Sequence, residues 1–339
     1  MRRTLSVECV TPMKTVLVTG ASGFVGGHVV AALARNGIRP RCLVRKTSRL
    51  EFIREFSPEI VFGDVVSLAS LESAVEGADG IIHCAGVTKA LSLENYMQVN
   101  AEGCENLYRA CLARNPGVRR IVHVSSLAAL GPSAAGRPVR EGEERRPVSD
   151  YGRSKLAGHR IAEAYMGRLP ITIVDPPAVY GPFDRDFLNV FAWVKRGISL
   201  MIGRQERWIS LIYAKDLSRA VLACLQNEKA AGNEYLVEDG CPHTWTEVAA
   251  EIGRSLHKSP VLLRLPPSLA KVACAVSGFV AKCTGKPTLF SRDKLKEMLE
   301  TSWTCSAIKI RAELGFSPEY SLEQGIEETY RWYTEHKWL

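Results

Sequence analysis

The sequence lacks the cysteine patterns that mark disulfide and zinc scaffolds. It has ten cysteines in 339 residues, but no two of them form a C-x-x-C pair, and most lie in apolar runs. This spacing is typical of buried thiols in a reducing compartment, so we expect a cytoplasmic protein with no metal site. H-E-x-x-H, nucleophile-elbow and G-K-[ST] motifs are also absent, which argues against the common hydrolases, metalloenzymes and phosphate-loop NTPases.

Long apolar runs and continuous stripes of charge are missing too. Within the apolar segment 265–283, the longest uncharged piece, 272–281, is too short to span a bilayer. The helical spacing of its apolar residues predicts a helix packed over a pocket, with a peripheral membrane contact near Lys271, Lys282 and Lys286 as the alternative. The net charge of +8 is scattered along the chain, so we expect no nucleic-acid partner.

Residues 1–12 have no apolar core, so we interpret them as a leader and not as a signal peptide, with disorder as one interpretation. Met13 adjoins the first expected strand and would also serve as a start. A hydrophobic content of 46% and a charged content of 24% are ordinary for a globular chain. The length is sufficient for two lobes built on one sheet.

One highly organised stretch is present at residues 15–37. An apolar run at 16–18 predicts a buried parallel strand, and a helical pattern follows it. Between them, Gly20 permits a sharp turn, Gly23 lets the backbone approach a pyrophosphate, and Gly26 allows the helix to pack closely on the strand. The free N–H groups of the helix N-terminus would bind the phosphates. This arrangement favours a dinucleotide site over a merely flexible turn.

Expected strands and helices then alternate through the first half of the chain. This order predicts an α/β fold with a doubly wound parallel sheet of the Rossmann type. The further expected strands are 39–44, 59–62, 81–84, 121–124 and 171–175, and the helices are 68–75, 92–114 and 151–166.

The residues after the second expected strand bear on the choice of cofactor. In dinucleotide-binding folds an acidic residue at this point binds the ribose 2′-hydroxyl, whereas an arginine accommodates a 2′-phosphate. Here the strand ends at Arg45 and Lys46, Arg49 follows, and the first acid is Glu51. The sequence therefore predicts a preference for NADP(H), with NAD(H) as the alternative.

Tyr151 and Lys155 lie four residues apart on an expected helix and so share one face. Because a neighbouring ammonium favours the phenolate, we expect Lys155 to lower the pKa of Tyr151. Such a tyrosine can exchange a proton with a carbonyl/alcohol pair while a hydride moves to or from nicotinamide. Ser126, at the end of the fifth expected strand, is placed to bond the same oxygen. The Y-x-x-x-K pattern alone is weak evidence for this chemistry. Its position in the chain, after the glycine turn and after Ser126, strengthens that evidence.

Together these motifs resemble the extended short-chain dehydrogenase/reductase superfamily, also called the NAD-dependent epimerase/dehydratase superfamily. The matching segments are 19–26, 63–65, 83–86, 125–131, 151–155, 179–182 and 211–217. The resemblance implies that Ser126, Tyr151 and Lys155 are catalytic and that Asn100 supports Lys155. The cofactor contacts that we expect are Gly20, Ser22, Gly23, Phe24, Val25, Gly26, Arg45, Lys46, Asp64, Val65, Cys84, Ala85, Gly86, Tyr151, Lys155, Pro177 and Val179.

Three positions depart from the sugar-nucleotide branch of this superfamily. That branch carries an Arg and an Asn where this chain has Asp175 and Ala178, and a phosphate-binding Arg where it has Ile209. The chain looks more like the branch of 3β-hydroxysteroid dehydrogenases and dihydroflavonol reductase-like ketoreductases. Four aromatic residues would suit a lipophilic substrate, although an ordinary core role explains them equally well: Trp193, Trp208, Phe279 and Phe290.

The resemblance also implies how the chain is divided. We expect residues 13–182 and 211–240 to form the Rossmann domain, and residues 183–210 and 241–339 to form a smaller C-terminal substrate-binding lobe. A homodimer through the helices that contain Asn100 and Tyr151 is implied as well.

The expected activity is NADP(H)-dependent interconversion of a ketone and a secondary alcohol on a hydrophobic steroid-, flavonoid- or polyketide-like molecule. Two alternatives remain open. One is a sugar-nucleotide epimerase or dehydratase that retains its cofactor. The other is a non-catalytic dinucleotide-sensing regulator, a class that tends to lose the Tyr–Lys pair.

Overall fold

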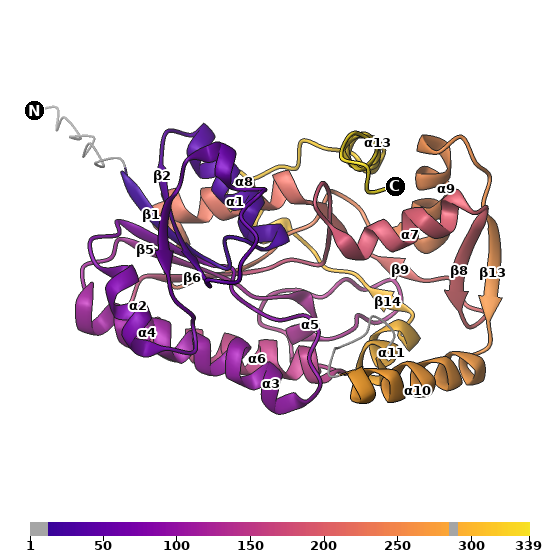
Figure 1. Ribbon diagram of the computed structural model, residues 1–339, viewed down its shortest axis with the longest axis horizontal. Helices are drawn as coiled ribbons and strands as arrows, with labels where there is room; N and C mark the ends of the chain where they lie inside the picture. Colours follow the sequence, from indigo (N-terminus) through magenta and orange to yellow (C-terminus); the bar gives the residue numbers. More distant parts are fainter. Residues whose placement is uncertain (1–12, 285–290) are drawn as a thin grey trace, which may run out of the picture.

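The computed structural model describes residues 13–284 and 291–339, with only the backbone of residues 279–283 (Figure 1). Four features expected from the sequence lie outside this description: the leader at 1–12, Lys286, Phe290, and the side chains of Phe279 and Lys282. Among the described residues, no helix combines the length and apolar character that crossing a bilayer requires.

A seven-stranded parallel sheet forms the centre of the larger lobe, in the order β11-β6-β5-β4-β1-β2-β3 (Figure 1). The chain leaves β1 toward β2 on one side and returns to β4 on the other, which creates the crevice where doubly wound sheets bind ligands. The predicted Rossmann-type fold is confirmed. The strands are β1 (Thr15–Thr19), β2 (Arg39–Val44), β3 (Glu59–Phe62), β4 (Gly80–His83), β5 (Arg120–Val124), β6 (Ile171–Asp175) and β11 (Glu234–Leu236).

Both faces of the sheet are covered because alternate strand residues point to opposite sides. In β1, Val16 and Val18 enter one core and Leu17 enters the other. The helices α1 (Phe24–Arg35) and α8 (Ala214–Gln226) cover the first face. The helices on the second face are α2 (Leu68–Val75), α3 (Leu93–Met97), α4 (Gly103–Arg114) and α6 (Asp150–Tyr165).

The predicted single helix at 92–114 is wrong in one respect. It consists of α3, a π-helical turn η2 (Gln98–Glu102) and α4. The wider turn contains Asn100 and precedes Gly103, where a β-carbon would lie 2.9 Å from the Val65 side chain. Such π turns accommodate a local packing demand that helical periodicity in the sequence does not reveal.

The smaller lobe lies at the opposite end of the molecule from β1 and β2 (Figure 1). Its short sheets pair β7 (Ala178–Tyr180) with β10 (Leu211–Tyr213), β8 (Ile198–Ile202) with β13 (Val261–Leu265), and β9 (Trp208–Ile209) with β12 (His243–Thr244) and β14 (Ser302–Trp303). Its helices are α7 (Arg185–Lys195), α9 (Trp245–Ser255), α10 (Pro267–Thr284), α11 (Arg292–Leu299) and α13 (Leu322–Glu335), whereas α12 (Ile308–Leu314) packs on the larger lobe.

The exact division into lobes stays a prediction. One segment that the sequence assigns to the substrate lobe packs elsewhere: Ala307, Ile310 and Phe316 enter the core on the α1 and α8 face of the large sheet. The remaining short helices are η1 (Arg54–Phe56), α5 (Leu127–Leu130) and η3 (Glu228–Ala230).

An aromatic cluster joins the loop after β2 to α13. Phe52 stacks on Phe183 with ring centroids 4.3 Å apart, and Phe183 lies 5.4 Å from both Trp332 and Trp338. Phe183 has a φ of +75°, a conformation uncommon outside glycine, and the surrounding rings hold it there. The ring of Phe52 also closes over α1, since a β-carbon at Gly27 would lie 2.2 Å from it.

Candidate dinucleotide-binding and catalytic site

The glycine turn between β1 and α1 leaves room for no side chain. Gly20 has a φ of +68°, and a β-carbon there would lie 2.7 Å from the backbone of Ala85. A β-carbon at Gly26 would lie 2.2 Å from the Gly20 carbonyl oxygen. The helix cap, Gly23, offers no side-chain acceptor to the first N–H groups of α1. This cradle fits a pyrophosphate, which would accept from those N–H groups.

The predicted adenosine-side residues surround the same crevice. Arg45 and Lys46 are exposed directly after β2, and neither forms an ion pair with any residue that the structure describes. Asp64 follows β3 and accepts the N–H of Val66 at 3.3 Å, while Val65 is buried. Two cations at this point suit a ribose phosphate better than a free hydroxyl.

The predicted nicotinamide-side residues follow β4. Cys84 donates its N–H to the Thr19 carbonyl at 3.1 Å, and Ala85 donates to the Thr19 hydroxyl at 3.3 Å. A β-carbon at Gly86 would lie 3.1 Å from Asn100 Oδ1, so this backbone passes close to the catalytic region. Of the other predicted contacts, Ser22, Phe24, Val25 and Val179 are partly exposed and Pro177 is buried.

Ser126 and Tyr151 are brought together from different elements. Ser126 caps α5, and its Oγ accepts the N–H of Ala128 at 3.1 Å. Tyr151 stands in the first turn of α6, and its phenol lies close enough to the Ser126 hydroxyl for this group to lower the pKa of Tyr151 in part. The two hydroxyls can therefore bind one carbonyl oxygen between them, as the sequence predicts.

Lys155 and Asn100 lie close to this pair and are both buried. Lys155 donates from Nζ to the Val124 carbonyl at 2.9 Å. The sequence predicts that Asn100 supports Lys155, but the contacts it makes are with other groups: Oδ1 accepts from Val87 N at 2.8 Å, and Nδ2 donates to Val87 O and to Ser154 Oγ. Asn100 thus joins the segment that follows β4 to α6, the helix that carries Lys155.

Burial changes the expected proton affinity of the tyrosine. The sequence predicts a lowered pKa for Tyr151, whereas desolvation raises the pKa to about 12, with the Ser126 hydrogen bond lowering it only in part. Desolvation also lowers the pKa of Lys155. Because the phenol keeps its proton at neutral pH, it is ready to act as an acid.

Asp175 holds the backbone at Ser126. Ser126 donates its N–H to Asp175 Oδ1 at 3.2 Å, and the neighbouring amides of Ser125 and Leu127 donate to backbone carbonyls at 2.8 Å. Three successive N–H groups of this turn are therefore fixed, the middle one by a carboxylate. Asp175 itself is fully buried, and its Oδ2 has no hydrogen-bond partner among the described residues.

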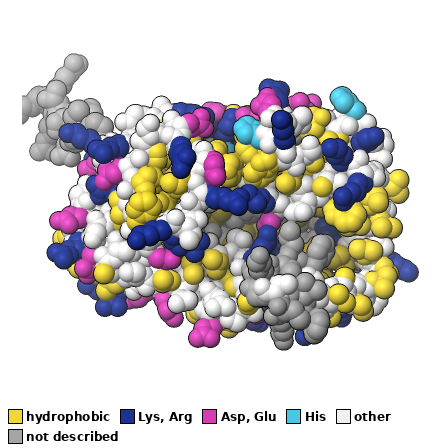
Figure 2. Space-filling model, in the orientation of Figure 1, with side chains coloured by type: hydrophobic (Ala, Val, Ile, Leu, Met, Phe, Trp, Pro, Cys, Tyr) yellow, Lys and Arg dark blue, Asp and Glu magenta, His cyan; other side chains and the backbone are white. Residues whose placement is uncertain are grey.

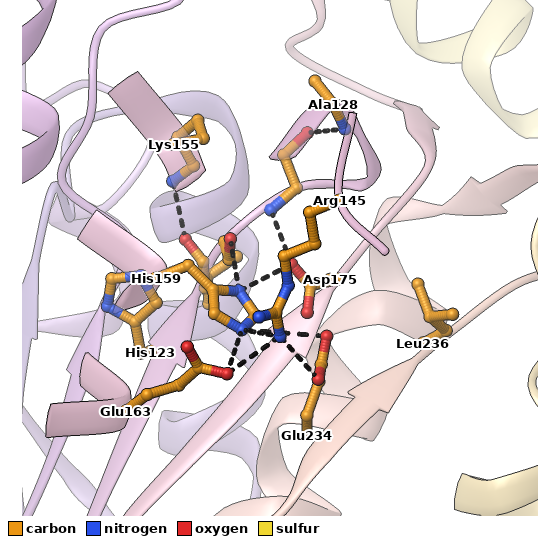
Figure 3. A network of polar contacts seen from close by, with 12 residues as sticks. His123, Ala128, Arg145, Lys155, His159, Glu163, Asp175, Glu234 and Leu236 are labelled. Carbon is orange, nitrogen blue, oxygen red and sulfur yellow. Dashed lines mark hydrogen bonds and ion pairs between the residues drawn. The ribbon is translucent and has the colours of Figure 1, made fainter. Parts of the chain in front are cut away.

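His159 and Arg145 offset the charge of Asp175 (Figure 3). His159 Nδ1 lies 3.4 Å from Asp175 Oδ1, and His159 Nε2 lies 2.7 Å from Arg145 Nη2. Arg145 also pairs with Glu163 and Glu234, each at 2.9 Å. The imidazole can accept from Arg145 when neutral and donate to Glu163, 3.5 Å away, when protonated. This network of buried and partly buried charges lies directly behind the serine.

A helix of the smaller lobe caps the start of α6. Asp293, from α11, accepts the N–H groups of Asp150 at 2.6 Å and Tyr151 at 3.1 Å. Glu297, one turn later, accepts from the Ser149 hydroxyl at 2.6 Å. Because carboxylates are favoured at a helix N-terminus, α11 stabilises the turn that carries Tyr151.

A buried cluster beside Lys155 has the residue types of a metal site. The potential ligand atoms of His83, Cys104 and His123 lie within 4.8 Å of one another. His83 already bonds Thr19 at 2.7 Å and Cys104 at 3.3 Å, and His123 bonds Tyr108 at 2.8 Å. Desolvation raises the pKa of Cys104 to about 12, so its thiol keeps its proton in these surroundings. The contacts describe a hydrogen-bonded core cluster.

The side toward the smaller lobe offers little for a phosphate. Ile209 occupies the position where the sugar-nucleotide branch has its arginine. Arg207, two residues before it, donates to the carbonyls of Glu300 and of Ile202, the latter at 2.5 Å, and desolvation lowers its pKa. Its guanidinium thus joins two segments of the lobe.

Sequence reasoning missed His159, Arg145, Glu234 and Asp293. His159 is four residues after Lys155 on one helix face, so its proximity could have been found. Arg145 and Glu234 come from a loop and a distant strand, and no local pattern marks them. Asp293 is 142 residues from Tyr151 and becomes visible only in the folded chain.

Comparisons with known proteins agree with this geometry. The model of the NAD dependent epimerase/dehydratase family matches residues 16–237. Ceramide reductase from Caulobacter vibrioides (strain NA1000 / CB15N) is 34% identical, covering 96% of this chain and 96% of the relative. UDP-glucose 4-epimerase from Vibrio cholerae is 25% identical in sequence, and the match covers 93% of this chain and 94% of the relative. 3 beta-hydroxysteroid dehydrogenase/Delta 5-->4-isomerase from Mycobacterium tuberculosis (strain CDC 1551 / Oshkosh) is 26% identical, covering 98% and 94%.

Two solved structures show the same fold. The crystal structure of gox2253 has a TM-score of 0.80 at 24% identity, covering 95% of this chain and 98% of that one. MoeE5 in complex with UDP-glucose and NAD has a TM-score of 0.75 at 21% identity, covering 96% and 100%. At these identities the likeness concerns architecture alone.

Proposed function

Because the chain belongs to the NAD-dependent epimerase/dehydratase family, whose members include NAD-dependent reductases, dehydrogenases and epimerases, we propose that it is an oxidoreductase that interconverts a ketone and a secondary alcohol on a lipophilic substrate. The family and the expected contacts support a nicotinamide cofactor in the cradle of Gly20, Gly23 and Gly26. The exposed Arg45 and Lys46 support a preference for NADP(H) over NAD(H).

The proposed mechanism assigns one task to each residue around the reacting oxygen. When bound, the nicotinamide supplies the hydride for reduction or accepts it in oxidation. Tyr151, whose raised pKa keeps the phenol protonated, donates a proton to the carbonyl oxygen in reduction. Ser126 donates a second hydrogen bond to that oxygen. Lys155, fixed by the Val124 carbonyl, lies where it can bind the ribose hydroxyls and restore the proton.

One observation carries the choice of a lipophilic substrate: the position where the sugar-nucleotide branch has its phosphate-binding arginine is occupied by Ile209. Asp175 is buried under Ser126, Ile209 is apolar, and Arg207 is bound to backbone carbonyls. The 34% sequence identity to ceramide reductase, over 96% of both chains, also supports a lipophilic substrate. The eight cysteines that the structure describes are all free thiols, which supports a cytoplasmic location.

The test is oxidation of NADPH, followed by absorbance, with the full chain and a panel of steroid and sphingoid ketones. We expect turnover with at least one ketone, and we expect Tyr151→Phe to reduce it by ~10²-fold or more. Tyr165→Phe is the matched control because Tyr165 lies on the same helix, with its hydroxyl on Glu105. Full turnover by Tyr151→Phe would contradict the mechanism.

The sequence similarity to UDP-glucose 4-epimerase keeps one second function in view. The same assay with UDP-glucose, analysed for products, tests it. Conversion of UDP-glucose without net loss of NADPH would favour an epimerase with a retained cofactor over the ketoreductase. Cofactor binding without turnover of any substrate would favour the dinucleotide-sensing regulator.

A further inference from the structure

The helix α10 is apolar around most of its circumference and yet largely exposed. Leu269 is 58% exposed, and Val272 and Val276 are each 61% exposed. Among the side chains of α10 that the structure describes, only Ala270 and Cys274, one turn apart, are buried. A helix that is hydrophobic on all sides is normally enclosed by protein or lipid. Most of the described part of α10 therefore has an apolar surface that no described residue covers.

The strand directly before this helix extends the apolar surface. In β13, Val261 is 72% exposed and Leu263 is 47% exposed, because alternate residues point away from the lobe. We call the five side chains Val261, Leu263, Leu269, Val272 and Val276 the β13–α10 face. Figure 2 shows hydrophobic side chains gathered at this end of the molecule, with Lys and Arg side chains among them.

The charged side chains of the segment that carries this face all have one sign. Residues 252–292 form a run of 41 residues with seven Lys or Arg and no Asp or Glu, although the whole chain has 36 acidic residues. Two of these cations, Arg264 and Lys271, are exposed within the face itself. Apolar side chains flanked by cations only are complementary to a bilayer surface with anionic lipids, where each nearby cation strengthens binding.

The position of the face relates it to the site described above. α10 packs through Ala270 and Cys274 against Leu295 of α11. α11 in turn contacts the N-terminus of α6 through Asp293, beside Tyr151. A bilayer in contact with α10 would lie one helix away from the catalytic tyrosine.

We propose that the β13–α10 face binds a membrane surface that contains anionic lipids. Resting on the proposed function, this contact would bring a lipophilic substrate in the bilayer to within one helix, α11, of Tyr151. The binding itself depends only on the apolar and basic side chains of the face, and its test needs neither cofactor nor substrate.

The experiment sediments the full chain with vesicles of phosphatidylcholine alone and of phosphatidylcholine with phosphatidylglycerol. We expect binding to the anionic vesicles that weakens as salt is added. The double variant Val272→Glu/Val276→Glu should lower the partition coefficient by about tenfold or more, because it removes apolar contact and adds repulsion. Lys271→Glu should lower it less and should also reduce the salt dependence.

Ile308→Glu is the matched control. Ile308 is 63% exposed on α12, outside this face, so its variant should bind vesicles like the wild type. Equal binding by the wild type and the double variant would overturn the proposal, as would no binding to anionic vesicles. Self-association of the wild type that the double variant abolishes, without vesicle binding, would assign the face to a second copy. Ketone reduction is measured in parallel. Reduction without vesicle binding would contradict only the membrane contact, and vesicle binding without reduction would contradict only the proposed function.

Discussion

At the scale of single residues, Arg45 makes the choice of cofactor testable. Its guanidinium is exposed at the end of β2 and forms no ion pair with the described residues. A charge-assisted hydrogen bond to a 2′-phosphate is worth about 1.5–3 kcal/mol. We expect Arg45→Ala to weaken NADPH binding ~10-fold, with little change for NADH, in a fluorescence titration.

Arg39→Ala is the control for this measurement. Arg39 starts the same strand and pairs with Glu59 at 3.2 Å, far from the expected cofactor. Equal loss of affinity for both cofactors in Arg45→Ala would show that the residue does not contact the 2′-phosphate.

Asp175 and His159 make a prediction about pH. Burial alone would lower the pKa of His159, but Asp175, Glu163 and Glu234 outweigh it and raise the pKa to about 9. Protonated His159 therefore stabilises the fold fully below its unfolded pKa of about 6.5, and this contribution disappears as the pH rises through 9. We expect the free energy of unfolding to fall by on the order of 2 kcal/mol across this window.

The comparison variant is Asp175→Asn, which keeps an oxygen for Ser126 N–H but removes the charge that attracts the imidazole proton. Urea unfolding at both ends of the window should show a smaller loss of stability in this variant. An identical slope would mean that His159 does not titrate against Asp175.

At the scale of elements, the contact between α11 and α6 predicts that a residue of the smaller lobe affects the catalytic tyrosine. Asp293→Ala leaves the N–H groups of Asp150 and Tyr151 without their acceptor. Loss of a capping carboxylate costs about 0.5–2 kcal/mol. We expect a lower melting temperature and a reduced kcat, with Asp293→Asn intermediate in both because it retains one oxygen. A variant that is destabilised but keeps full kcat would limit Asp293 to a structural role.

The helices and strands also show which features of the fold could be predicted from the sequence alone. The strands expected at 39–44 and 59–62 match β2 and β3 residue for residue, because short strands bounded by turns are a local signal. The turn at η2 and the cap by Asp293 were not predictable, since both arise from contacts between distant segments. Asp175 was recognised only as a departure from the sugar-nucleotide branch. Its bond to Ser126 N required the folded sheet.

At the scale of the whole molecule, a groove between α4 and α6 is where we propose that two copies meet. It has a volume of about 550 Å³ and presents Glu102 and Glu105 near Arg109 and Arg160, so a twofold axis would bring opposite charges together. Ile161→Glu, in the same groove, should convert a dimer to a monomer in size-exclusion chromatography with light scattering. A wild type that is monomeric at all concentrations would contradict the proposal.

The aromatic cluster of Phe52, Phe183, Trp332 and Trp338 has an optical consequence. It places two indole rings against Phe183, which stacks on Phe52 of the loop after β2. The same loop begins with Arg45 and Lys46, which we expect to contact the cofactor. Tryptophan emission overlaps the absorption of a reduced nicotinamide, so a bound cofactor would quench these indoles by energy transfer. The protein thus contains its own label-free reporter of cofactor occupancy, and Trp338→Phe would reveal how much of the signal comes from the end of the chain.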